Sequence, residues 1–341
     1  MTSAPLPAYP RITDLGGGVT LIDTLHNGHP GTIGVFLLAL PDGGHALVET
    51  GPGITIPEVS AGLTAAGASL TDLRYVLVTH IHLDHAGAAG AIARLSGAEL
   101  IVHEVGAPHL IDPSRLMASA TRVYGDALAG LWGTMEPAPA ATVRAVAGGE
   151  RLALGGLRVD VHYTPGHASH HVSYLTGDGT LFAGDVAGVL LAGCPIIRPA
   201  LAPPELDLEA AENSLATLRA LRPDRMLLTH FGPVPDVDAH LTAVAQRNRL
   251  WEAAVIAGLD AGEDQATLTR RLQALEDREL DEAGVAPGIA ARYKQTSDAA
   301  MTVGGLSRYL TKFHPERLAA GRAEGEPGGG GVGSGGGDHG A

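Results

Sequence analysis

The sequence predicts an α/β fold in which two β-rich halves carry helices on their outer faces. Three observations predict it: short apolar, β-rich segments alternate with helical patterns up to residue 235, four of these segments end in residue types that bind metals, and only helical patterns follow from residue 236 to about residue 321. The 341 residues are enough for a large core, and they allow one large domain or two ordinary ones.

The first half of the chain contains short apolar segments separated by turn signals. The sequence PDGG at 41–44 is a hairpin turn signal between two of them. The small-residue pattern AGAAGAIARLSG predicts a helix at 86–97, and residues 104 to about 140 predict a helical insert whose longest helix covers 114–135. Strands are predicted at 19–24, 32–40, 45–50, 74–78 and 99–103, with a further helix near 57–67.

The second half returns to strands and then becomes helical. Strands are predicted at 157–167, 171–176, 180–185 and 225–230, with an amphipathic helix at 205–221. The glycine-rich end EPGGGGVGSGGGDHGA cannot form a packed core and is predicted to be flexible. The chain is therefore divided into an N-terminal arm (1–18), a domain of strands and helices (19–235, including the insert), a helical C-terminal region (236–321) and a flexible Gly-rich tail (322–341).

The segment THIHLDHAG directly follows the predicted strand 74–78 and precedes a helix. His80 and His82 are two residues apart at a strand end, so they project to the same side. Asp84 and His85 follow at the turn, where the backbone reverses and can direct them toward the same space. Imidazoles and a carboxylate suit zinc, iron or manganese, and desolvating this group without a metal would cost free energy. The segment is therefore a candidate metal site.

Three later strands end in the same way. The segments VHYTPGH, LFAGD and MLLTH end at His167, Asp185 and His230. Together with the first segment they supply seven candidate ligands from four strand ends, and strand ends are the usual place for a site in an α/β sheet. Seven ligands are enough for two metal ions that share one carboxylate.

The motifs HIHLDH, TPGH, FAGD and LTHFG resemble, in order and approximate spacing, the metal motifs of the metallo-β-lactamase superfamily. The resemblance covers roughly residues 19 to 235 and implies an αββα sandwich with the site at one edge. It also implies His80, His82 and His167 on the first metal, Asp84, His85 and His230 on the second, and Asp185 bridging both. At LVETG this chain has Glu49 where the superfamily often has an aspartate that supports the ligands.

The resemblance implies a dinuclear metal-dependent hydrolase that acts through a metal-bound hydroxide on a small carbonyl substrate such as an ester, lactone or thioester. The expected cofactors are two divalent ions, zinc first, with iron or manganese as alternatives. Asp84 is the carboxylate expected to handle protons in catalysis. Three alternatives stay open: a phosphodiesterase or nuclease on the same metals, a mononuclear-iron sulfur dioxygenase, and a non-catalytic metal binder.

The composition of the chain limits the classes of binding partner that we expect. The net charge of −14 argues against nucleic acid and anionic membranes, since both need Lys and Arg at the contact. A single cysteine, Cys194, excludes an intrachain disulfide and a thiolate metal cage. The N-terminus lacks the pattern of a signal peptide, and no apolar run is long enough to span a bilayer, so we expect a cytoplasmic protein with a small-molecule substrate. The helical C-terminal region is expected to cover the pocket, form a homodimer interface, or do both.

Several further side chains have both a structural and a substrate-facing interpretation. His26 and His29 lie between two early strands, in a loop that can overhang the site in the resembling fold. His170 and His171 follow His167 closely, and a structural role is the simpler interpretation of both. The insert offers four more candidates, which either line a pocket or belong to a surface helix: Arg115, Arg122, Tyr124 and Trp132.

Overall fold

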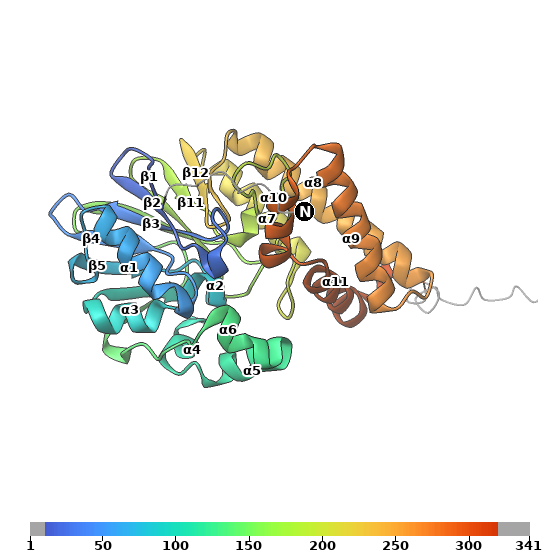
Figure 1. Ribbon diagram of the computed structural model, residues 1–341, viewed down its shortest axis with the longest axis horizontal. Helices are drawn as coiled ribbons and strands as arrows, with labels where there is room; N and C mark the ends of the chain where they lie inside the picture. Colours follow the sequence, from blue (N-terminus) through green and yellow to red (C-terminus); the bar gives the residue numbers. More distant parts are fainter. Residues whose placement is uncertain (1–10, 320–341) are drawn as a thin grey trace, which may run out of the picture.

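Two β-sheets pack face to face, and helices cover the outer face of each (Figure 1). The structure is a computed structural model that describes residues 11–319. Apolar side chains from the two inner faces form the central core, in which Phe36, Tyr174 and Phe182 are fully enclosed. The α/β class and the αββα sandwich expected from the sequence are therefore confirmed.

The first sheet has seven strands in the order in which they occur along the chain. The strands β1 to β4 are antiparallel neighbours, whereas β4 to β7 run parallel. Strand β6 is apolar along most of its length because helices cover one face of the sheet and the second sheet covers the other. The strands are β1 (Ile12–Asp14), β2 (Val19–Asp23), β3 (Gly34–Ala39), β4 (His45–Val48), β5 (Leu73–Leu77), β6 (Glu99–His103) and β7 (Val143–Val146).

The second sheet has six strands in the order β13-β12-β11-β10-β9-β8. Only β11 and β12 are parallel neighbours within it. The carboxyl ends of these two strands and of β5 in the first sheet lead into the segments that carry the candidate ligands, so the site forms at one edge of the sandwich. The strands are β8 (Arg151–Leu154), β9 (Leu157–Tyr163), β10 (Val172–Thr176), β11 (Thr180–Phe182), β12 (Arg225–Leu228) and β13 (Gly232–Pro233).

The helices form two outer layers, an insert and a C-terminal group. The first sheet is covered by α1 and α3, which contribute Val59, Leu63 and Ile92 to an outer core, and the second sheet by α7 and α8. The insert comprises α4 to α6. The helices of the sandwich and insert are α1 (Ile56–Ala65), α2 (Leu83–Ala86), α3 (Ala89–Ser96), α4 (Ala107–Ile111), α5 (Ser114–Tyr124), α6 (Leu128–Trp132) and α7 (Leu208–Ala220).

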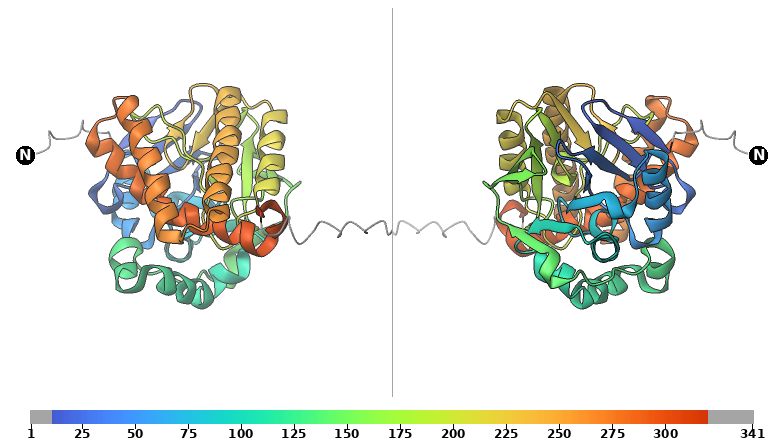
Figure 2. Two further views of the ribbon diagram at one scale, coloured as in Figure 1. Left: turned by 90° about the vertical axis from the view of Figure 1, so that its right-hand side faces the viewer. Right: turned by 90° about the vertical axis from the view of Figure 1, so that its left-hand side faces the viewer.

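The C-terminal helices confirm the helical patterns found after residue 236. They are α8 (Val237–Asp260), α9 (Gln265–Glu282), α10 (Pro287–Thr296) and α11 (Ala299–Arg308), and they stand in front of the sandwich in the left view of Figure 2. Asp236, Asp264 and Asp298 cap α8, α9 and α11 by accepting backbone N–H groups. Among residues 11–319 no helix is long and apolar enough to cross a membrane.

The structure corrects several details of the elements. Residues 12–14 of the predicted N-terminal arm (1–18) form β1 because they pair with β2. Residues 1–10 of that arm and the predicted tail (322–341) lie outside the described residues. The helix predicted over 114–135 is divided, because the backbone at Gly125 takes φ 54° and ψ −137°. The short strands β7, β8 and β13 were not predicted; each has four residues or fewer, so its own sequence contains little periodicity.

Gly90 on α3 provides a test of how the insert is attached. A Cβ at this position would lie 2.0 Å from the carbonyl oxygen of Glu136 and 2.9 Å from the amide nitrogen of Ala138, so the returning end of the insert lies directly on the helix. We expect Gly90→Ala to lower the free energy of unfolding by about 1–3 kcal/mol in urea denaturation. Gly130→Ala in α6 is the matched control, since its Cβ would meet nothing within 4 Å, and it should be neutral or stabilising. Equal stability of the two variants would contradict this packing.

Candidate metal centre

All seven candidate ligands lie together at one edge of the sandwich. His80 and His82 follow β5, Asp84 and His85 belong to the single turn of α2, and the remaining three follow β9, β11 and β12. They form two groups in which one nitrogen or oxygen atom of each residue lies within 4.8 Å of the others: His80, His82 and His167 in the first, and Asp84, His85, Asp185 and His230 in the second. The structure therefore brings together every residue that the sequence predicted for the site.

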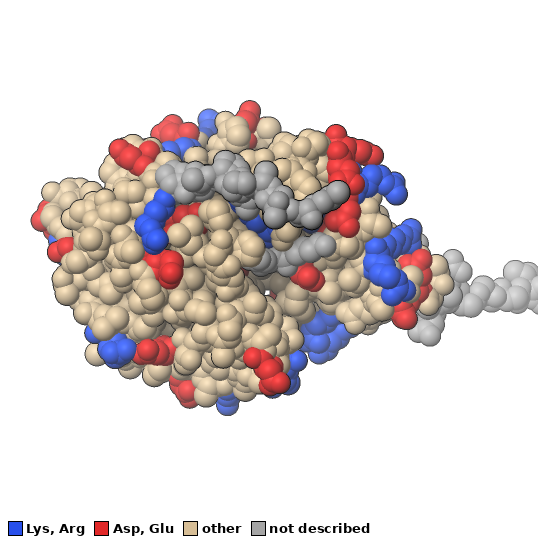
Figure 3. Space-filling view, viewed as in Figure 1, with Lys and Arg blue, Asp and Glu red and all other residues tan. Residues whose placement is uncertain are grey.

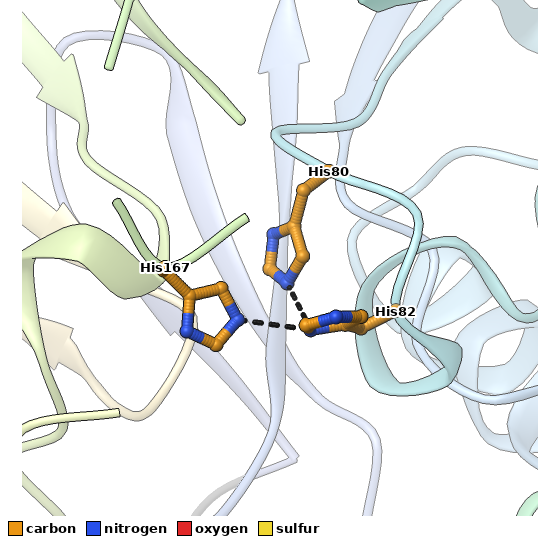
Figure 4. A group of neighbouring side chains, drawn as sticks. All are labelled: His80, His82 and His167. Carbon is orange, nitrogen blue, oxygen red and sulfur yellow. Dashed lines mark hydrogen bonds between the residues drawn. The ribbon is translucent and has the colours of Figure 1, made fainter. Parts of the chain in front are cut away.

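Three imidazole nitrogens converge in the first group (Figure 4). His82 Nδ1 lies 3.0 Å from His80 Nε2 and 2.9 Å from His167 Nε2. The rings of His80 and His167 stand nearly perpendicular to one another, with centroids 4.8 Å apart. Such an arrangement directs three nitrogen atoms at one point.

Hydrogen bonds on the far side of the rings fix the tautomers of this group. His167 Nδ1 donates to the carbonyl oxygen of Ala200 at 2.7 Å. His80 Nδ1 donates to Thr79 Oγ1 at 3.1 Å, because the only hydroxyl proton of Thr79 is donated to Glu49 Oε1 at 2.6 Å. In the neutral rings, both Nε2 atoms therefore present lone pairs to His82, whose Nδ1 has one proton at most and cannot satisfy both. A cation at this point would satisfy all three nitrogens.

The second group combines two imidazoles with two carboxylates. His85 Nε2 lies 3.2 Å from Asp185 Oδ1, and His230 Nε2 lies 3.4 Å from Asp84 Oδ2. Neither contact has the geometry of a hydrogen bond, although both rings are fully buried. Their Nδ1 atoms are used, since His85 donates to Glu49 Oε1 at 3.1 Å and His230 to the carbonyl oxygen of Thr32 at 2.8 Å. Buried nitrogens without partners are costly, and a metal ion would remove that cost.

Asp185 lies between the two groups. Its Oδ1 faces the second group, at 3.2 Å from His85 Nε2 and 3.7 Å from His230 Nε2. Its Oδ2 faces the first group, at 3.7 Å from His167 Nε2. The carboxylate therefore presents one oxygen to each group, and the whole cluster is compatible with a dinuclear metal site.

The electrostatics differ between the groups. Burial, followed by the neighbouring imidazoles of His167 and His170, lowers the pKa of His82 to about 3, so this ring is neutral at pH 7. Burial also opposes protonation of His85, but the charges of Asp185, Glu49 and Asp84 outweigh it and raise the pKa of His85 well above its ordinary value. The same negative potential that attracts a proton to the second group attracts a metal cation, which would take the place of that proton.

Glu49 supports both groups from behind. It is buried, and its backbone takes φ 64°, which directs the side chain from the end of β4 under the site. Its Oε1 accepts hydrogen bonds from Thr79 Oγ1, His85 Nδ1 and Thr229 Oγ1 at 2.6, 3.1 and 3.3 Å. The glutamate that departs from the usual pattern of the superfamily therefore links the ends of β4, β5 and β12 to α2.

The remaining candidates lie around the cluster rather than in it. His170 is buried beside the first group, with its ring centroid 5.7 Å from that of His82, and His171 is buried 5.2 Å from His80. His26 Nε2 donates a hydrogen bond to the carbonyl oxygen of Leu131 at 2.6 Å. Neither His26 nor His29 belongs to a ligand group. In the insert, Arg115 and Arg122 are exposed, Tyr124 is half-buried and Trp132 is buried. For His170 and His171 the sequence left a contact with the site open but favoured a structural role, and the structure buries His171 against the ring of the candidate ligand His80.

Known proteins are similar to this chain in sequence. The family model of the metallo-beta-lactamase superfamily matches residues 29–230. A metallo-beta-lactamase fold-containing protein of Sulfurisphaera tokodaii is 32% identical over 199 residues, which are 57% of this chain and 74% of that protein. A hydroxyacylglutathione hydrolase of Anaeromyxobacter dehalogenans is 30% identical over 284 residues, which are 81% of this chain and 91% of the relative.

Solved structures of proteins from the same superfamily resemble this chain. The crystal structure of an archaeal metallo-beta-lactamase superfamily protein from Sulfolobus tokodaii matches with a TM-score of 0.55 at 28% identity, over 66% of this chain and 85% of that one. A metallo-beta-lactamase family protein from Thermus thermophilus has a similar fold, with a TM-score of 0.64 at 22% identity over 87% of this chain and 94% of that one. The chain therefore belongs to the metallo-beta-lactamase superfamily and is a metal-dependent hydrolase.

Proposed function

We propose that the chain binds two divalent metal ions and hydrolyses a small carbonyl substrate, an ester, lactone or thioester. The observation that carries the proposal is the set of buried imidazole nitrogens that converge on the carboxylates of Asp84 and Asp185, two of them without a hydrogen-bond partner in the described chain. Metal ions that activate water at neutral pH are held by such sets of neutral nitrogens and carboxylates.

The two groups divide the ligands. His80, His82 and His167 would hold one ion through three nitrogens, and Asp84, His85 and His230 would hold the other, with Asp185 shared. Zinc is the proposed metal because nitrogen donors with carboxylates suit it, and iron or manganese is the alternative. When bound, two such ions supply Lewis-acid polarisation of a carbonyl oxygen and lower the pKa of water.

The chain's own residues orient the substrate and transfer the proton. The side chain of Asp84 is 19% exposed, compared with 7% for Asp185 and at most 1% for His85 and His230, so Asp84 is the most accessible member of the second group to a substrate or water. We assign it the proton transfer between the attacking water and the leaving group. Glu49 holds Thr79, His85 and Thr229 in position through three hydrogen bonds, and we assign it no contact with the substrate.

A thioester is our first candidate substrate. The relative from Anaeromyxobacter dehalogenans is named for hydroxyacylglutathione hydrolysis, and its similarity extends over 81% of this chain. A nucleic acid is a poor candidate because of the net charge of −14, and on the face shown in Figure 3 the Lys and Arg side chains lie in small groups among Asp and Glu. We therefore propose a small molecule that reaches the cluster directly.

A hydrolysis panel tests the proposal. Protein purified without chelator would be assayed with a hydroxyacylglutathione thioester, a lactone, a phosphodiester and a β-lactam, alongside elemental analysis for metals. We expect turnover of the thioester or the lactone, loss of that turnover on addition of a chelator, and its return with zinc. Turnover of the phosphodiester alone would replace the proposal with the phosphodiesterase alternative.

A further inference from the structure

An asparagine interrupts the apolar stripe of α8. The side chains that this helix buries against its neighbours recur at intervals of three or four residues and include Leu241, Val244 and Trp251. Asn248 occupies the position between Val244 and Trp251 in this stripe, and it is only 7% exposed. Packing alone would favour an apolar side chain at this position, so the amide needs another explanation.

The amide oxygen of Asn248 has no donor in the described chain. Its Oδ1 is enclosed, and neither a side chain nor a backbone N–H group of the described residues donates a hydrogen bond to it. An enclosed amide oxygen without a donor costs free energy, because folding has removed it from water and has not replaced the lost hydrogen bond. A bound water molecule would remove this cost. Because water both donates and accepts, it suits the amide in either orientation.

Asn248 lines a narrow cavity beside the metal centre. The cavity has room for about one water molecule. The other polar side chains in its lining are those of His167 and Asp185, and the remaining side chains of the lining are apolar. Asp84, to which we assign the proton transfer, does not line the cavity. The cavity therefore reaches the metal ligands from the side of α7 and α8, and not through the member of the cluster assigned to the substrate.

The opposite wall of the cavity offers the further partners that a buried water needs. Ala200 belongs to this wall, and its carbonyl oxygen accepts the hydrogen bond from His167 Nδ1 at 2.7 Å. A carbonyl oxygen has a second lone pair, and the carboxylate of Asp185 can accept several hydrogen bonds. Buried waters make about three hydrogen bonds, typically to polar groups that are otherwise unsatisfied. A water bound to Asn248 would therefore restrain a ligand of the first group and the carboxylate shared by both groups.

A surface groove gives this water a route to solvent. The groove has a volume of about 170 Å³ and lies between α7 and α8, where Leu208, Ala245 and Asn248 contribute to its lining. These two helices lie side by side in the left view of Figure 2. Asn248 lines both the groove and the cavity, so it stands at the boundary between them.

We propose that Asn248 is a positioning residue that holds one ordered water molecule against His167 and Asp185 and thereby fixes ligands of both metal positions. The inference rests on the proposed function, since it assumes metal ions at the cluster. The water acts through hydrogen bonds alone and is not consumed in the reaction. Groups that support metal ligands from outside typically change metal affinity by about 10- to 100-fold when they are removed.

Asn248→Leu removes the amide and fills its place with an apolar side chain. We expect zinc affinity, measured by competition with a chromophoric chelator, to fall by about 10-fold, and kcat on the panel substrate to fall by a similar factor with little change in KM. The melting temperature should stay the same or rise, because leucine completes the apolar stripe of α8. A purely structural role of Asn248 would give the opposite result, a lower melting temperature with unchanged zinc affinity.

Two further variants separate the water from the amide itself. Asn248→Ser keeps a polar group and leaves room for water, so it should keep most of the parental zinc affinity. Asn213→Leu is the matched control, since it makes the same substitution at an exposed position of α7 that does not line the cavity. It should bind zinc as the parent does. Equal losses of affinity in Asn248→Ser and Asn248→Leu would show that the amide acts without a water, which would overturn the inference.

A high-resolution crystal structure of the zinc-loaded parent tests the inference directly and does not depend on how any variant folds. We expect an ordered water within hydrogen-bond distance of the Asn248 amide and of the opposite wall of the cavity. A parent without this water, or an Asn248→Leu variant with parental zinc affinity, would overturn the inference alone. A parent that binds no metal would instead overturn the proposed function, and the inference with it.

Discussion

Replacing Asp185 by alanine is expected to remove most of both metal ions and to lower turnover by roughly 100-fold or more. The carboxylate directs Oδ1 toward His85 and His230 and Oδ2 toward His167, so its loss weakens both ion positions at once. The five imidazoles of the two ligand groups remain in the variant, but the negative charge that Asp185 places between the two ion positions is lost. Elemental analysis of the variant beside the parent, both purified without chelator, measures the effect.

His230→Ala is the matched comparison, since His230 faces only the second group. This variant should retain roughly one equivalent of metal, whereas Asp185→Ala should retain much less than one. Both should keep the parental circular dichroism spectrum, because neither side chain belongs to an apolar core cluster. An Asp185→Ala protein with two equivalents of metal and near-normal turnover would contradict the shared role of this carboxylate.

Glu276→Ala is expected to lower the free energy of unfolding by about 3–5 kcal/mol, as is typical when one partner of a buried ion pair is removed. Glu276 Oε2 lies 2.9 Å from Arg198 Nη1, and both side chains are 1% exposed. The guanidinium also stacks on Tyr293 of α10, with 4.5 Å between Cζ and the ring centroid. Without Glu276 the arginine would be buried without a counter-charge.

Two controls separate this effect from ordinary surface electrostatics. Glu279 lies on α9 like Glu276, but it pairs with Arg247, and both of these side chains are about one-fifth exposed. Glu279→Ala should therefore lower the free energy of unfolding by about 1 kcal/mol or less. Arg198→Met combined with Glu276→Leu should recover most of the stability, because burial already raises the pKa of Glu276 to about 7 despite the arginine. Equal losses for Glu276→Ala and Glu279→Ala in urea denaturation would contradict the account.

The Arg198 ion pair also connects the C-terminal helices to the metal centre. Arg198 comes shortly before Ala200, whose carbonyl oxygen accepts the hydrogen bond from His167 Nδ1. Glu276 belongs to α9, so the position of this acceptor depends on a helix far away in the sequence. A loss of activity in Glu276→Ala under conditions where it remains folded would therefore come from a displaced His167.

Much of the site could be predicted from the sequence because its chemistry is local. His80, His82, Asp84 and His85 lie within six residues, and a strand pattern ends shortly before each later ligand. Strand ends at one edge of a sheet converge, so seven candidate ligands could be named without coordinates, and the resemblance to the superfamily divided them between two ions.

The features of the site and fold that the sequence did not predict depend on contacts between distant segments of the chain. Glu49 receives hydrogen bonds from Thr79 and Thr229, which lie 30 and 180 residues away, so its supporting role was uncertain from the motif alone. Tyr124 had a surface interpretation of equal weight until its edge-on contact with the buried ring of Trp132 was known. Strand β1 consists of three residues that become a strand only by pairing with β2.

Stepwise return of zinc to chelator-treated protein tests the central claim, that this chain is a hydrolase with two metal positions, most directly. Hydrolysis of the substrate found in the panel would be measured after each addition, with bound zinc counted on the same samples. The account predicts that turnover rises until roughly two equivalents are bound and then stays constant. Full turnover at one equivalent would contradict two working positions, and an iron-loaded protein that consumes oxygen with a persulfide while every ester stays intact would contradict hydrolysis itself.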